Sequence, residues 1–115
     1  MSDIKDLTEK IIKFRDERDW KQFHKSKDLA ISLVLEASEV LEHFQWKNEE
    51  EIEEYVKTNK NQIGDEIADV FIYLMDIAHG LDIDIKKAVE DKLVKNEKKY
   101  PVEKAKGRHT KYNKL

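Results

Sequence analysis

Four carboxylates stand at matching places in two apolar stretches of this 115-residue chain. The first stretch reads LVLEASEVLEHF and carries Glu36 and Glu39. The second begins thirty residues later, reads IGDEIADVFIYL, and carries Glu66 and Asp69. An E-x-x-E in one stretch is therefore matched by an E-x-x-D at the same positions of the other. Carboxylate oxygens are hard ligands that suit Mg²⁺ or Mn²⁺, so these four side chains are candidate metal ligands.

Helical geometry places the carboxylates of each stretch beside an apolar face. At about 100° per residue, the apolar side chains of each stretch fall within one arc about 100° wide. They are Leu33, Ala37, Val40, Leu41 and Phe44 in the first stretch and Ile63, Ile67, Val70, Phe71 and Leu74 in the second. If the two helices pack antiparallel through these faces, the carboxylates meet at one rim. They would repel each other there, and would be costly to desolvate, unless cations lie between them.

A simpler explanation of the same residues is a solvated helix edge. Charged residues make up 41% of the chain, and glutamates at helix edges are common. A single E-x-x-E would carry little weight, but here the pair recurs in register within the two most apolar helices. Acidic residues repeated in this way favour a functional site.

Composition bounds the class of protein. The length indicates one domain, and 39% hydrophobic residues are enough for a core, although the mean hydropathy of −0.80 implies a largely charged surface. A small chain of long helices often completes its core by oligomerising. The 22 basic and 25 acidic residues are interspersed and give a net charge of −3, so nothing indicates binding to a nucleic-acid polymer.

Features that the sequence lacks exclude other classes. No cysteine is present, which excludes a disulfide framework, a zinc–thiolate site and a thiol nucleophile. The first ten residues, MSDIKDLTEK, contain no apolar core of a signal peptide, and no apolar run approaches membrane length. We therefore expect no membrane contact and a cytoplasmic location.

Few residues interrupt the helical periodicity. Pro101 is the only proline, and Gly64, Gly80 and Gly107 are the only glycines, so we expect an all-α bundle of four to five helices. The predicted helices are Asp3–Arg18 with Ser2 or Asp3 as cap, Leu29–Trp46 with Ser26 or Asp28 as cap, Asn48–Thr58, a helix from Asn59 or Asn61 to about His79, and Ile85–Tyr100 with Asp82 or Asp84 as cap. We assign residues 1–101 to the domain and expect residues 102–115 to form a polar, flexible tail.

The connection after the first helix, DWKQFHKSKD, groups Trp20, Phe23 and His24 among polar residues. One explanation is that these rings only seal the end of the bundle. The alternative is that Trp20 and His24 line a pocket for a planar ligand. Lys25 or Lys27 would then lie near the charge of that ligand.

Two further groups have both a structural and a functional explanation. His43 follows the first carboxylate pair and is a ligand, a partner of a ligand, or an ordinary histidine on the helix surface. The last helix ends in DKLVKNEKKYP, whose lysines favour the helix dipole and would also suit a polyanionic ligand.

The segments ERDWKQFH, LEASEVLEHFQW, DEIADVFIYL and DKLVKNEKKYP resemble a known family. The chain is similar to the MazG-like nucleotide pyrophosphohydrolases of the all-α NTP pyrophosphatase superfamily, in particular to the small single-domain dCTP pyrophosphatase branch. The likeness extends from about residue 4 to residue 101. The flanking motifs W-x-x-F-H, F-Q-W and K-Y-P make it more specific than the carboxylates alone.

The resemblance implies an enzyme that splits a nucleoside triphosphate into a monophosphate and pyrophosphate, with dCTP and modified deoxynucleotides as candidate substrates. By position, the ligands of Mg²⁺, or of Mn²⁺ as a substitute, are Glu36, Glu39, Glu66 and Asp69, and the base is Glu36 or Glu39. The residues expected near the nucleobase and sugar are Trp20, His24, Trp46 and Tyr73. Those expected at the phosphates or sugar, which a neighbouring subunit of a homodimer or tetramer can supply, are Lys92, Asn96 and Tyr100.

One position departs from the pattern of the family. Relatives that prefer dCTP are expected to have a polar or histidine side chain on the first helix, about where Ile11 stands here. The apolar side chain puts a preference for cytosine in doubt. It does not affect the metal motif.

Two rival functions remain open on the sequence. A di-iron or di-manganese helical bundle needs E-x-x-H motifs on two helices, and neither Glu36 nor Glu66 is followed by histidine at the third place. A non-catalytic, all-α interaction module would use the carboxylates for solubility and salt bridges only. Mutation of the carboxylates would then leave metal binding unchanged.

Overall fold

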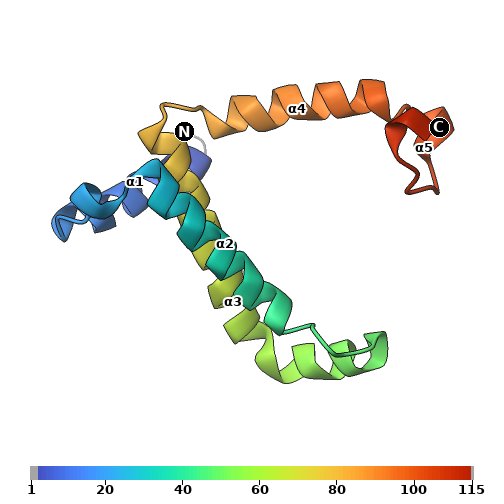
Figure 1. Ribbon diagram of the computed structural model, residues 1–115, viewed down its shortest axis with the longest axis horizontal. Helices are drawn as coiled ribbons and strands as arrows, with labels where there is room; N and C mark the ends of the chain where they lie inside the picture. The colour runs from blue at the N-terminus through green and yellow to red at the C-terminus, as the bar shows by residue number, and fades with distance from the viewer. Residues whose placement is uncertain (1–2, 115) are drawn as a thin grey trace. The chain divides into compact units, whose positions relative to one another are not determined.

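The computed structural model describes residues 3–114, which form five α-helices, two short 3₁₀ helices and no strand within that range (Figure 1). The α-helices are α1 (Asp3–Glu17), α2 (Ser26–Glu42), α3 (Glu49–Gly80), α4 (Ile85–Lys99) and α5 (Val102–Ala105), and the 3₁₀ helices are Lys21–Phe23 and Tyr112–Lys114. The predicted all-α class is confirmed. The chain divides at Asp82 into two compact units, which are described separately.

In the first unit, α2 runs beside α3 in the opposite direction, and α1 also packs on α3 (Figure 1). The buried apolar side chains of this unit are Leu29 of α2 and Ile63, Met75 and Ala78 of α3. The antiparallel contact of α2 with α3 is the arrangement that the two matching apolar stretches predict. It places both carboxylate pairs on adjacent helices.

The contact between α2 and α3 buries less of each apolar face than the sequence predicts. Leu41 and Ile67, which we placed in the buried arcs, are 57% and 53% exposed, and Leu74 is exposed as well. Val34, outside those arcs, is 66% exposed. The contact between two helices covers a stripe narrower than an arc of about 100°, so apolar side chains at the flanks of that stripe remain in solvent.

The end of α2 also differs from the prediction. The helix begins at Ser26 and ends at Glu42, four residues before the expected end at Trp46. Its N-cap is Lys25, which makes no side-chain cap, so the caps expected there are wrong. Trp46 lies in the connection to α3 with a backbone φ of 68°. This left-handed backbone conformation is rare for residues with a bulky side chain.

The predicted break between two helices near Asn59 is wrong, because α3 is one helix of 32 residues. The side chain of Asn59 donates a hydrogen bond of 2.9 Å to the carbonyl oxygen of Tyr55, inside the helix. No proline or glycine stands between Glu49 and Ile63 to end the helix. The helix bends instead, so that its N-terminal part leaves the direction of the part beside α2 (Figure 1).

The N-terminus of α3 has the cap that the sequence predicts. The side chain of Asn48 accepts a hydrogen bond of 2.9 Å from the backbone of Glu51, and the Glu51 side chain accepts one of 3.2 Å from the backbone of Asn48. This capping box satisfies two backbone donors that would otherwise lack partners. It fixes the point at which the long helix begins.

In the second unit, α4 begins after Asp84, whose carboxylate accepts a hydrogen bond of 3.1 Å from the backbone of Lys87. The helix ends at Lys99, one residue before the predicted end, and α5 follows Pro101 within the segment expected to be a flexible tail. The domain boundary at residue 101 stays a prediction. Ser2, proposed as a cap, lies outside the described residues. None of the described helices combines the length and apolar character needed to cross a membrane.

Candidate functional site

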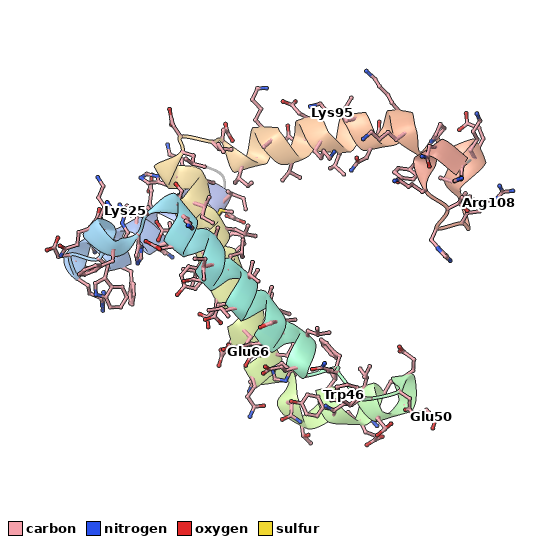
Figure 2. All side chains as sticks on the ribbon, in the orientation of Figure 1. Lys25, Trp46, Glu50, Glu66, Lys95 and Arg108 are labelled. Atoms are coloured by element: carbon pink, nitrogen blue, oxygen red, sulfur yellow. The ribbon has the colours of Figure 1, made fainter. Side chains whose placement is uncertain are left out.

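Glu36 on α2 lies close enough to the other three carboxylates, on α2 and α3, for their charges to affect its pKa. Partial burial and the adjacent Glu39 raise the pKa of Glu36, and the charges of Asp69 and Glu66 on the facing helix raise it further. Glu36 therefore experiences the other three carboxylates, which is the neighbourhood that the repeated motif predicts. Figure 2 labels Glu66 on the part of α3 that lies beside α2.

One carboxylate oxygen of this cluster is a buried hydrogen-bond acceptor without a partner. Oε2 of Glu36 is buried and forms no hydrogen bond. A buried acceptor without a partner costs about 1–3 kcal/mol, and more if it is charged. A cation bound among the carboxylates would remove this cost.

The donor set fits a hard divalent cation such as Mg²⁺, because it consists of carboxylate oxygens, one of them buried without a partner. Within residues 3–114, no three histidine or carboxylate side chains are close enough together to hold a metal ion as they stand. Carboxylates that repel each other have no reason to converge until a cation lies between them. Binding of the ion would therefore require some of these side chains to turn toward a shared point.

His43 is a partner of a carboxylate rather than an ordinary surface histidine. Its Nε2 atom is hydrogen-bonded to Oε2 of Glu66, and its Nδ1 atom lies 2.6 Å from the hydroxyl oxygen of Tyr55. From the sequence, the role of His43 was open and Tyr55 was not expected near it. The spacing held a signal, because eleven residues are close to three helical turns and place Tyr55 on the side of Glu66.

A second polar cluster joins α1, the following connection and α3. Nη1 of Arg15 lies 3.1 Å from Oδ1 of Asp76, and Nδ1 of His24 lies 2.6 Å from Oδ2. Arg15 and Asp76 are the two buried charged residues of the described chain, and no role was predicted for either. A signal for Asp76 existed, because seven residues separate it from Asp69, and two helical turns bring both to one side of α3.

The aromatic residues of the first connection lie against this cluster. The ring of Trp20 is 6.3 Å from that of His24 and 5.8 Å from that of Phe14, in an edge-on arrangement. A cavity of about 250 Å³ opens beside His24, and its basic lining residues are Arg15, Lys21, His24 and Lys25, whereas Trp20 does not line it. Of the residues expected to line a pocket for a planar, charged ligand, His24 and Lys25 line this cavity, and the role of Trp20 stays a prediction.

Two other residues expected near the nucleobase are placed differently. Trp46 is 91% exposed in the connection between α2 and α3, where Figure 2 labels it. Tyr73 is half-buried on α3, between Asp69 and Asp76 on the same side of the helix. The single chain thus places Tyr73 between the two clusters and leaves the indole of Trp46 in solvent.

The residues expected at the phosphates belong to the second unit. Lys92 and Asn96 lie four residues apart on one face of α4. The backbone of Tyr100, which caps this helix, donates a hydrogen bond of 2.8 Å to the carbonyl oxygen of Asn96. Their roles stay predictions.

Comparison with known proteins gives consistent results. The sequence matches the model of the MazG-like family over residues 31–115. It is 34% identical to dCTP pyrophosphatase 1 of Rattus norvegicus over 114 residues, which cover 97% of this chain and 67% of that protein. It is 33% identical to the Homo sapiens protein of the same name over 114 residues, which again cover 97% of this chain and 67% of that protein. Among solved structures, a pyrophosphatase from Archaeoglobus fulgidus superposes with a TM-score of 0.82 at 38% identity, covering 88% of this chain and 94% of that one.

Proposed function

Since the chain belongs to the MazG-like family and is a nucleotide pyrophosphohydrolase, we propose that it uses Mg²⁺ to hydrolyse a nucleoside triphosphate to a monophosphate and pyrophosphate. The observation that supports the metal is the buried, unpartnered Oε2 atom of Glu36 among three other carboxylates. A triphosphate carries the same sign of charge as this cluster. It can bind there only after cations have reversed the local charge.

The proposed roles of the carboxylates follow from their positions. Glu36, Glu39, Glu66 and Asp69 hold the metal, with Mn²⁺ as a substitute for Mg²⁺. Bound Mg²⁺ supplies polarisation of the α-phosphate, neutralisation of the leaving pyrophosphate and a lower pKa of a bound water. Whichever of Glu36 and Glu39 keeps an oxygen free of the metal accepts the proton of the attacking water with that oxygen.

The proposed orientation of the nucleotide follows the side of α3 that carries Asp69, Tyr73 and Asp76. The phosphates lie at the carboxylates, and the base lies toward Trp20 and His24, whose rings are 6.3 Å apart. Asp69 and Asp76 are separated by about 10 Å along the helix axis, a length that an extended nucleotide can span. Tyr73 would contact the sugar between them.

The proposed substrates are deoxynucleotides, with dCTP and modified deoxynucleotides as first candidates because relatives of this chain are named dCTP pyrophosphatase 1. Ile11 on α1 is half-buried and apolar, which argues against a strong preference for cytosine. We also propose that the protein acts in the cytoplasm as a homodimer or tetramer. The exposed apolar side chains of α2 and α3 favour self-association.

Pyrophosphate release tests the proposal. A panel of canonical and modified nucleoside triphosphates is incubated with the protein, with and without Mg²⁺, and both products are quantified. We expect release only with Mg²⁺, loss of release in Glu39→Ala, and little change in Glu42→Ala. Glu42 is a suitable control because it is an exposed carboxylate one turn further along α2. Equal release without Mg²⁺, or from Glu39→Ala, would contradict the metal mechanism.

A further inference from the structure

His43, at the C-terminal end of α2, uses both of its ring nitrogens inside the protein. Nε2 is hydrogen-bonded to Oε2 of Glu66, and Nδ1 lies 2.6 Å from the hydroxyl oxygen of Tyr55. The side chains of His43 and Glu66 are only 10% and 28% exposed. This chain of contacts links the connection after α2, the N-terminal part of α3 and a candidate metal ligand.

The direction of these hydrogen bonds follows from the donors available. A carboxylate only accepts, so Nε2 of His43 carries the hydrogen that it donates to Glu66. In the neutral ring Nδ1 then accepts, and the Tyr55 hydroxyl donates to it. Tyr55 therefore orients the His43 ring, and His43 in turn orients the Glu66 carboxylate.

We infer that His43 and Tyr55 are positioning residues that occupy Oε2 of Glu66 and leave its other oxygen, Oε1, to face a metal ion. The inference rests on the proposed metal-dependent function and assigns the manner in which one ligand is held. A carboxylate fixed at one oxygen presents the other in a defined direction and does not have to be ordered when the metal binds. The Glu66 carboxylate would thus bind the metal through a single oxygen.

A purely structural explanation makes a different prediction. If His43 and Tyr55 only connect the end of α2 to α3, their loss lowers thermal stability and leaves the affinity of the folded protein for a metal unchanged. If they position Glu66, metal affinity falls even where the protein remains folded. Loss of a hydrogen-bonded partner of a metal ligand typically costs about 10–100-fold in affinity.

Titration of Mn²⁺ into the metal-free protein, followed by calorimetry, separates the two explanations. His43→Leu removes both ring nitrogens at similar bulk, whereas His43→Gln keeps an amide donor near the position of Nε2. We expect His43→Leu to weaken Mn²⁺ binding about 10–100-fold and His43→Gln to restore most of that loss. Tyr55→Phe should weaken binding about 2–10-fold, because one oriented hydrogen bond is lost. His79→Leu should change nothing, since His79 is exposed near the end of α3.

Circular dichroism in chelator establishes that each variant is folded before titration. Unchanged Mn²⁺ affinity in folded His43→Leu would overturn the inference, and so would failure of His43→Gln to restore affinity. If His43→Leu does not fold, Tyr55→Phe decides, because it keeps the ring that packs beside His43. Absence of Mn²⁺ binding by the unaltered protein would instead overturn the proposed metal site itself. Equal Mn²⁺ affinity of the unaltered protein and all variants, in contrast, would overturn only the positioning roles of His43 and Tyr55.

Discussion

The guanidinium of Arg15 on α1 is held 3.1 Å from the carboxylate of Asp76 on α3, although the two residues are 61 positions apart in the sequence. Both side chains are more than nine-tenths buried. The second oxygen of Asp76 holds Nδ1 of His24 at 2.6 Å. A buried ion pair therefore fixes the ring of a residue that we expect to contact the nucleotide.

Replacing Asp76 by alanine should destabilise the protein by about 3–5 kcal/mol, because it leaves the buried guanidinium of Arg15 without its partner. Urea unfolding followed by circular dichroism measures the loss. Asp16→Ala is the matched control, since Asp16 also contacts Arg15, at 2.9 Å, but is 53% exposed. An exposed partner of this kind is worth about 1 kcal/mol at most. Equal losses in the two variants would show that burial of the Arg15–Asp76 pair has no energetic consequence.

The metal-free protein should become less stable as the pH rises through the titration of Glu36. Its pKa is raised above the ordinary value of 4.5 by burial and by Glu39, so the folded chain holds this proton more tightly than the unfolded chain. The free energy of unfolding therefore falls as the pH passes the unfolded value and continues to fall up to the raised one. Above that range Glu36→Gln should melt at a higher temperature than the unaltered protein.

Melting curves in chelator, taken from about pH 4 to about pH 8, test this dependence on Glu36. The advantage of Glu36→Gln should become small at the acid end, where the carboxyl is mostly protonated in both the folded and the unfolded chain. Glu42→Gln, at an exposed position of the same helix, should follow the unaltered protein throughout. An advantage of Glu36→Gln that is constant with pH would point to packing rather than charge.

Addition of Mg²⁺ should raise the melting temperature of the unaltered protein. A ligand that binds only the folded state at a free concentration about 100 times its Kd adds about 2.7 kcal/mol to the free energy of unfolding. Asp69→Ala should lose most of this gain, because one ligand is removed. Glu50→Ala, in the exposed acidic run at the start of α3, should retain it. A gain that both variants retain would indicate non-specific screening of negative charge.

Trp46→Ala should separate catalysis from stability. The side chain is 91% exposed, so its removal should change the free energy of unfolding by no more than about 0.5 kcal/mol. Stacking of a base on an aromatic ring is worth about 1–3 kcal/mol, so kcat/KM should fall about 5- to 150-fold if the base stacks on Trp46 instead of lying toward Trp20 and His24. Trp46→Phe, which keeps a ring, should recover most of the activity.

A contact of Trp46 with a second copy of the chain would give a different result. If the indole instead contacts a second copy of the chain, alanine would leave kcat/KM of the assembled protein unchanged. The melting temperature would then depend more strongly on protein concentration in the variant than in the unaltered protein. Kinetics and melting curves at several protein concentrations distinguish the two cases.

The sequence predicts the carboxylate neighbourhood well because its cause is local. Glu36 and Glu39 are one helical turn apart, as are Glu66 and Asp69, and helical periodicity alone fixes their relation to an apolar face. Antiparallel contact of the two helices then follows from burying those faces. After burial and Glu39, the charges of Asp69 and Glu66 on the facing helix contribute to the raised pKa of Glu36, as that contact implies.

Other features depend on contacts that no local pattern encodes. Arg15 on α1 belongs to a stretch with an ordinary amphipathic pattern, and only the folded chain shows that its charge meets Asp76 in the interior. Asn59 is a good helix cap by type, yet its amide bonds to the preceding turn and α3 continues. Trp46 has a left-handed backbone conformation, which tryptophan rarely adopts, so residue propensities do not predict this conformation.

The uninterrupted course of α3 also limits how the length of this protein can vary. One helix carries Tyr55, Glu66, Asp69 and Asp76, and thus positions contributing to both polar clusters. A single residue inserted between Tyr55 and Asp76 would rotate everything beyond it by about 100° and would separate side chains that now share a side. Insertions and deletions should therefore be rejected within this segment of α3. In a library of random single-codon insertions, the variants that keep function should carry no insertion between Tyr55 and Asp76.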